Sequence, residues 1–137
     1  MATDLTNTTV WPILHYRDID AALACLVGVF GFHEALLARD DSNQVVHAEL
    51  SWPTGGTVLV GSTRHTGGVH GHLQPGTSAM YVPTSDVDAI HQRAVAAGLS
   101  VIQHPHTTRF GNGADAHAFS VRDTEGYAWT FGDYAGA

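Results

Sequence analysis

The chain has 137 residues, 44% of them hydrophobic and 14% charged, and a formal net charge of -7 at pH 7. This length fits one domain with an apolar core of its own. The six basic residues are all arginines, are scattered along the chain and are outnumbered by 13 acidic residues, which excludes nucleic acids and anionic membranes as expected partners. No apolar run reaches the roughly 20 residues that cross a bilayer, and residues 1–4 lack a signal-peptide pattern, so we expect a cytoplasmic protein.

The first half of the chain predicts one strand, one helix and three further strands. Residues 11–16 form an apolar run of strand length. Asp18 is a typical N-cap, apolar residues then recur at helical spacing up to Phe30, and Gly31 supplies the left-handed residue that ends a helix. The three strands are predicted at residues 32–38, 44–52 and 57–61, between polar or glycine-containing turns. Cys25 lies within the predicted helix and is the only cysteine, so we expect a small buried residue and no disulfide.

The second half repeats this order. Residues 62–76 are rich in glycine, threonine and histidine and show no periodicity, which predicts a loop. A strand is predicted at residues 78–84, a helix from Asp86 to Gly98, and strands at 99–103, 116–122 and 127–132, with a loop over 105–115. We therefore expect one domain over residues 1–137, with module one at about 8–63, a linker at about 64–76 and module two at about 77–134.

Two βαβββ modules predict an α+β fold. Each module alone leaves one apolar face of its sheet uncovered, so two curved sheets pair around a cleft and the helices cover the outside. Tyr127, Trp129 and Phe131 alternate along the last strand, and we expect them to pack under the helices as core.

Several short motifs give the chain a resemblance to a known superfamily. They occupy residues 18–22, 30–32, 47–50, 121–127 and 129–134. Over about residues 11–134 the chain is similar to the vicinal oxygen chelate superfamily, which includes glyoxalase I, bleomycin-resistance proteins and extradiol dioxygenases. The resemblance implies the glyoxalase/bleomycin-resistance fold and a homodimer. It leaves the chemistry open, because this fold hosts isomerases, epimerases, dioxygenases, thiol transferases and drug binders.

The metal-dependent members of the superfamily take His, Gln or Glu ligands from the first and last strand of each module. Counting from the helix starts and from the turn before the last strand, the resemblance assigns these positions to Trp11, Val60, Ala79 and Thr130. None of these side chains is a usual metal ligand. We therefore expect no metal and no other cofactor.

A relocated metal site is the alternative. His15 shares a strand face with Trp11 and Ile13, and His47 shares one with Glu49. Together with His117, the set His15, His47 and Glu49 offers ligands suited to Zn, Mn, Fe or Ni. The competing interpretation is that His47 and Glu49 contact each other or solvent at the mouth of the cleft. Glu49 and His47 are also the candidates for a general base in a metal-free enzyme.

Two loops attract attention for their composition. The first contains His65, His70 and His72, and the second contains the pair His104 and His106. We expect these histidines to be solvated. Residues 109–113 combine Arg109 and Phe110 with glycines, which fits either a mobile flap over the cleft or an ordinary turn.

These observations favour metal-free binding, or sequestration, of a small molecule. Trp11 places an indole at one of the positions that hold a metal ligand in other members, and an indole can stack on a planar ligand. The negative charge of the chain favours a neutral or cationic ligand. The rivals are a glyoxalase-like metal-dependent lyase, isomerase or dioxygenase with unusual ligands, and a metal-free enzyme. We expect the ligand to be bound by Trp11, Ile13, His15, His47, Glu49, Tyr81, Phe110 and Thr130.

Overall fold

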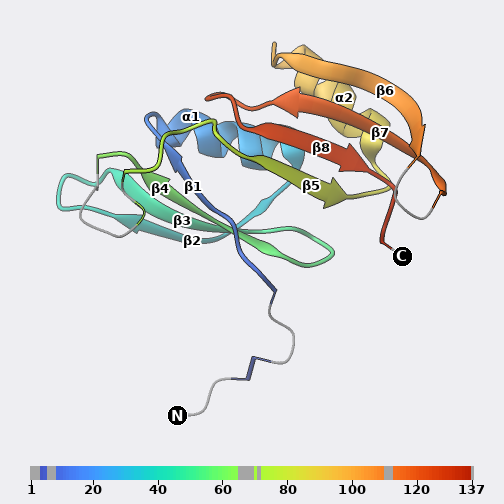
Figure 1. Ribbon diagram of the computed structural model, residues 1–137. Coiled ribbons are helices and arrows are strands. Elements are labelled where there is room, and N and C mark those ends of the chain that lie inside the picture. Colours follow the sequence, from blue (N-terminus) through green and yellow to red (C-terminus); the bar gives the residue numbers. More distant parts are fainter. Residues whose placement is uncertain (1–3, 6–8, 65–69, 71, 110–112, 137) are drawn as a thin grey trace.

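The computed structural model describes residues 4–5, 9–64, 70, 72–109 and 113–136, and its strands form two four-stranded sheets (Figure 1). The first sheet has the strand order β1-β4-β3-β2 and the second β5-β8-β7-β6. In each sheet the first strand of the module is parallel to the last, and the other neighbours are antiparallel. The expected α+β fold of two βαβββ modules is confirmed. The elements are β1 (Ile13–Tyr16), α1 (Ile19–Leu23), η1 (Ala24–Phe30), β2 (His33–Arg39), β3 (Val45–Ser51), β4 (Thr57–Ser62), β5 (Ala79–Pro83), α2 (Val87–Ala96), β6 (Val101–Arg109), β7 (Asp115–Arg122) and β8 (Ala128–Gly132).

The first helix begins and ends where the sequence predicts but changes type midway. Asp18 caps it, with Oδ1 accepting the backbone N–H of Ala21 at 3.0 Å, and Gly31 ends it at φ 103°. From α1 the chain passes into the π-helical η1, whose last turn closes through a bond from the Gly31 N–H to the carbonyl of Leu26, five residues back. The expected continuous α-helix is therefore wrong over η1. Leu26 and Phe30 are buried in this geometry, so the apolar spacing does not distinguish the two helix types.

In module two, strand β6 is longer than the sequence predicted. Strand β6 runs to Arg109, whereas the sequence predicted a strand ending at Gln103 and then a loop. Pro105 lies within this strand, because β6 is the edge of its sheet and the register shifts between Gln103 and His106. A proline is tolerated at an edge or a bulge because no ladder N–H is needed there.

One core joins the modules where the helix-covered faces of the two sheets meet. Phe30 from module one packs on Trp129 and Phe131, with ring centroids 5.5 and 4.9 Å apart. Tyr127, Trp129 and Phe131 are at most 3% exposed, so the predicted core residues of the last strand are confirmed. Cys25 is buried as expected. Among the described residues, no helix is long and apolar enough to cross a membrane.

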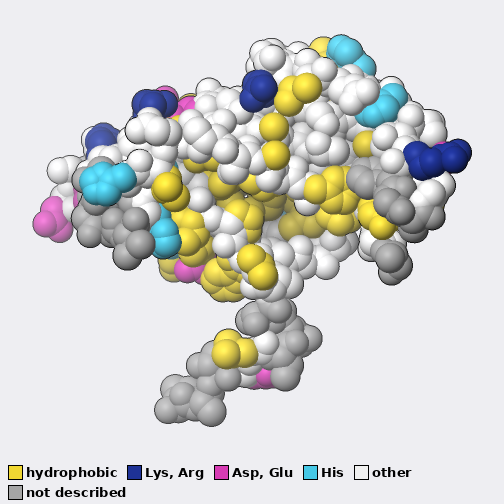
Figure 2. Space-filling view, in the orientation of Figure 1, with side chains coloured by type: hydrophobic (Ala, Val, Ile, Leu, Met, Phe, Trp, Pro, Cys, Tyr) yellow, Lys and Arg dark blue, Asp and Glu magenta, His cyan; other side chains and the backbone are white. Residues whose placement is uncertain are grey.

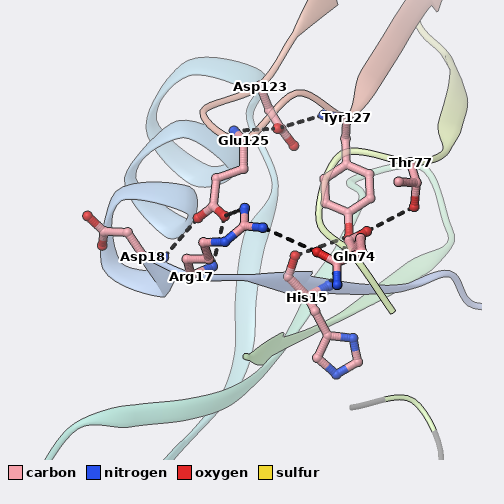
Figure 3. Close-up of polar contacts among 8 residues, drawn as sticks. All are labelled: His15, Arg17, Asp18, Gln74, Thr77, Asp123, Glu125 and Tyr127. Atoms are coloured by element: carbon pink, nitrogen blue, oxygen red, sulfur yellow. Dashed lines mark hydrogen bonds and ion pairs between the residues drawn. The ribbon is translucent and has the colours of Figure 1, made fainter. Parts of the chain in front are cut away.

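A tight turn between β7 and β8 fastens module two to the first strand and helix of module one (Figure 3). The Glu125 carboxylate accepts the backbone N–H groups of Arg17 and Asp18, both at 2.8 Å. The Tyr127 hydroxyl donates to the carbonyl of His15 at 3.1 Å and accepts the His15 N–H at 3.2 Å. These bonds fix the backbone of β1, and with it the direction of the His15 side chain.

Candidate functional site

Each sheet has one face that packs on the core and one that faces away from it, here called the open face. On β1, Leu14 and Tyr16 are at most 2% exposed and point into the core, so Ile13 and His15 belong to the open face. The strand register extends this face to the neighbouring strands: Ile13 stands opposite Leu59 and His15 opposite Gly61, which in turn stands opposite His47. The first sheet therefore brings together four predicted residues, Ile13, His15, His47 and Glu49.

His15 is the buried polar residue of this face. Its side chain is 7% exposed, and its Nδ1 atom is buried without a hydrogen-bond partner among the described residues. The ring lies against Gly61, where an added Cβ would meet ring atoms Cδ2 and Nε2 at 3.1 and 3.2 Å. Burial lowers the pKa of His15 below its ordinary value, and the charge of nearby His70 lowers it further. The imidazole is thus held neutral near pH 7.

The open face of the second sheet carries Tyr81 and Thr130, which stand opposite each other on β5 and β8. Thr130 Oγ1 is 2.6 Å from Ser120 Oγ on the neighbouring strand. The Tyr81 hydroxyl donates to the carbonyl of Tyr134 at 2.6 Å and lies over Gly132, where a Cβ would approach it to 2.9 Å. Each sheet therefore places a ring over a glycine on its open face.

The alternative metal set is not brought together. His117 lies on the opposite face of β7 from the open-face residue Ala118, and its Nε2 is 2.7 Å from Asp88 Oδ1 of α2. His47 Nε2 is 3.9 Å from Glu49 Oε2, and both side chains are more than a third exposed. Within the described ranges no three His, Cys, Asp or Glu side chains are arranged to hold a metal ion. His117 is separated from the other three by its place in the sheet, which the residue spacing did not reveal.

A cavity of about 190 Å³ lies where the two modules meet. One wall consists of Phe32, Trp52 and Trp129, whose rings pack edge to face around Phe32 at centroid distances of 4.9 and 5.6 Å. Met80 and Tyr81 from β5 line the other side. Figure 2 shows apolar side chains gathered along the middle of this view, over β1 and β5. The cavity is lined by apolar and aromatic groups, with Thr57, Tyr81 and backbone groups as its polar contributors.

The sequence analysis missed most of this cavity. Among the described residues that were predicted to bind the ligand, Tyr81 is the one that lines it. The others do not: Trp11, Ile13, His15, His47, Glu49 and Thr130. Val10 and Pro12, the neighbours of Trp11, do line it. Trp11 precedes β1 and remains 40% exposed. Phe32 and Trp52 lie at strand ends next to turns, and no sequence signal distinguishes such aromatics from ordinary core residues.

Two predicted loop features have different outcomes. Phe110 and His65 lie outside the described residues. His104 and His106 belong to β6 rather than to a loop, and His104 Nδ1 is 2.8 Å from Nε2 of His91 on α2. The expected loop is therefore wrong at His104, which lies in the edge strand, whereas its side chain is exposed as expected.

Comparison with known proteins identifies the family. Residues 9–131 match the model of the Glyoxalase/Bleomycin resistance protein/Dioxygenase superfamily. The chain belongs to this superfamily. TioX from Micromonospora sp. ML1 is 31% identical, with 91% of this chain and 97% of that chain covered and a TM-score of 0.74. A superfamily member from Sphaerobacter thermophilus DSM 20745 has 17% identity, 89% and 93% coverage and a TM-score of 0.65, so it shows the fold alone. A comparison with curated proteins gave no match.

The register corrects one of the four positions at which metal-dependent members of the superfamily carry ligands. Ile13 precedes Asp18 by as many residues as Tyr81 precedes Asp86, and these two residues stand opposite Leu59 and Thr130. The β4 counterpart of Thr130 is therefore Leu59. The predicted Val60 is wrong, because it is 0% exposed and faces the core.

The corrected set, Trp11, Leu59, Ala79 and Thr130, offers one oxygen, and that hydroxyl already bonds to Ser120. Carboxylates, imidazoles and amides are absent from these four positions. The donor set does not fit a divalent metal ion.

Proposed function

We propose that this protein binds a planar, mainly apolar small molecule between its modules and uses no metal ion to do so. The observation that carries the proposal is the cavity walled by Phe32, Trp52 and Trp129. Ligand sites are typically concave, lined by apolar and aromatic groups, and supplied with few polar groups that fix orientation. The cavity has this composition, and flat rings stack well against indole and phenyl groups.

The size and charge of the protein narrow the ligand further. Ligand pockets commonly measure roughly 300–1,000 Å³, so the cavity of about 190 Å³ accommodates one part of a ligand. The remainder extends over the neighbouring open faces, where Ile13, Leu59 and Tyr81 lie. The net charge of -7 favours a neutral or cationic molecule.

Fluorescence tests the proposal because two tryptophans line the cavity. Titration with a neutral planar dye such as Nile red is expected to quench protein emission and to enhance dye emission saturably. Met80→Trp, at a half-buried wall position, is expected to fill the cavity and abolish binding. Met80→Leu conserves volume and serves as the matched control. Equal binding by the wild type and Met80→Trp would place the ligand elsewhere.

The metal part of the proposal has a separate test. Protein purified without a metal-binding tag is treated with a chelator and then with Zn, Mn, Fe or Ni in turn. We expect unchanged dye affinity and an unchanged melting temperature in each case, because the family's ligand positions lack donors. A melting temperature that rises saturably with one metal contradicts the metal-free assignment.

The homodimer expected from the family belongs to the proposal as well. Leu36 is 46% exposed on β2 and stands beside Glu49 in the row that contains Ile13 and Leu59. A second subunit facing this row would complete the enclosure of a ligand. Light scattering coupled to gel filtration is expected to give twice the mass of the chain, whereas a monomeric mass contradicts this assembly.

A further inference from the structure

The buried imidazole of His15 has a polar atom that the fold leaves unused. Nδ1 is buried, and the part of the chain that the structure describes supplies no hydrogen-bond partner to it. Native proteins pair the great majority of such atoms, so an exception calls for a reason such as a ligand or a catalytic role. The other buried polar side chains are Ser62 and Asp123, and both make hydrogen bonds in the structure. His15 therefore stands apart among the described residues.

The surroundings hold the ring in place without engaging this atom. Both backbone groups of His15 are bonded to the Tyr127 hydroxyl, so β1 does not shift freely at this residue. In Figure 3 the imidazole points away from the Tyr127 and Glu125 contacts. It rests on β4 at Gly61, where an added Cβ would meet ring atoms of His15 at 3.1 and 3.2 Å.

We propose that His15, which lies on the open face of the first sheet outside the lining of the cavity, determines specificity for the part of the ligand that extends over that face. Its Nδ1 atom hydrogen-bonds a hydroxyl group carried by a flat, uncharged aromatic ligand. This inference rests on the proposed function and names the ligand class. A neutral imidazole accepts through one nitrogen and donates through the other. A hydroxyl group both donates and accepts, so it fits Nδ1 in either tautomer. An anionic ligand is disfavoured beside Glu49 on a chain of charge -7.

The other charged and titratable groups of this region agree with a neutral partner. His47 and Glu49 lie on the next strand but one and face each other at 3.9 Å across exposed side chains. His70 is close enough to oppose a positive charge on His15. Protonating His15 to hold an anion would therefore work against its immediate environment, whereas a neutral hydroxyl needs no change of charge.

The test compares two probes that differ in one group, 2-naphthol and 2-methylnaphthalene. The wild type is expected to bind 2-naphthol about tenfold more tightly, which corresponds to one hydrogen bond to a buried partner. His15→Leu is expected to bind both probes equally and to retain the affinity for 2-methylnaphthalene. His91→Leu, which replaces a histidine of α2 whose Nε2 is 2.8 Å from His104 Nδ1, is the matched control and is expected to keep the tenfold preference.

The outcomes separate this inference from the proposed function. If both probes bind the wild type with equal affinity, or if His15→Leu keeps the preference for 2-naphthol, the role of His15 is wrong while the cavity remains a ligand site. If neither probe binds, the proposed function itself fails. Thermal unfolding of the ligand-free proteins provides a check on folding. His15→Leu is expected to melt no lower than the wild type above pH 7, because it removes an unpaired polar atom, and a clear loss of stability would assign His15 to the fold instead.

Discussion

Asp123 and His15 are both buried beside Tyr127, yet the fold treats their polar atoms in opposite ways. Asp123 Oδ2 accepts the Tyr16 hydroxyl and the Trp129 Nε1–H, and Oδ1 accepts two backbone N–H groups of its own turn. His15 Nδ1 has no such partner. A satisfied buried carboxylate stabilises the junction of the modules, whereas an unsatisfied imidazole costs stability and would gain a partner from the ligand that we propose. The comparison separates a residue that serves the fold from one that serves binding.

The largest loss of stability is expected from removing the carboxylate of Asp123, whose two oxygens both accept hydrogen bonds. Asp123→Ala leaves the Tyr16 hydroxyl and the Trp129 Nε1–H buried without an acceptor, and we expect a loss of about 3 kcal/mol or more in unfolding free energy. Urea unfolding followed by tryptophan fluorescence measures it. Asp115→Ala is the control, since Asp115 forms an exposed ion pair with Arg109, and a change below about 0.5 kcal/mol is expected. Similar losses in both variants would remove Asp123 from the junction.

A smaller loss is expected from Glu125, which holds the two modules together through two backbone N–H groups and an ion pair with Arg17 at 3.7 Å. Its side chain is 12% exposed and accepts the N–H groups of Arg17 and Asp18. Glu125→Ala is expected to lower the unfolding free energy by about 2 kcal/mol, because the start of the first helix loses both acceptors. Glu125→Gln keeps one acceptor oxygen and should recover part of this loss. Identical stabilities for the two variants would show that water replaces the carboxylate.

The sequence predicted features that depend on neighbouring residues better than features that depend on distant parts of the chain. Local signals located the helix starts, the left-handed Gly31 and the alternation of Tyr127, Trp129 and Phe131, because capping, turns and strand periodicity depend on near neighbours in the chain. The position predicted on β4, Val60, was wrong by one residue. Successive residues of a strand point to opposite faces, so this small error moved the predicted position from the open face to the core.

The candidate site was predictable only in part for a related reason. His15, His47 and Glu49 share a face because strand pairing follows from the module order, and alternation on each strand places them. The cavity formed by Phe32 and Trp52 arises where two modules pack, and such contacts leave no local pattern. The unpaired state of Nδ1 is equally invisible, because it depends on what the surrounding chain fails to supply.

A third prediction sharpens the comparison through pH. Burial and the charge of His70 hold the pKa of His15 below its ordinary value of 6.5. As the pH falls below 6.5, the unfolded chain takes up a proton at this residue and the folded chain does not, so the unfolding free energy decreases until the lowered pKa is reached. His15→Leu is expected to show a shallower decrease than the wild type between pH 6.5 and 5. Superimposable profiles would mean that His15 titrates normally in the folded protein.

The smallest effect is expected at Gly61, which gives the imidazole of His15 its place. A Cβ there would approach Cδ2 and Nε2 of the ring to 3.1 and 3.2 Å. The strand carrying the ring is fixed by the Tyr127 hydroxyl, so the ring must tilt, and Gly61→Ala should cost about 1 kcal/mol. In a His15→Ala background the collision is gone, and the same substitution should cost nothing measurable. A double-mutant cycle by urea unfolding therefore reports the contact directly. Additive effects would show that the ring does not lie against Gly61 in solution and that Nδ1 is free to find a partner elsewhere.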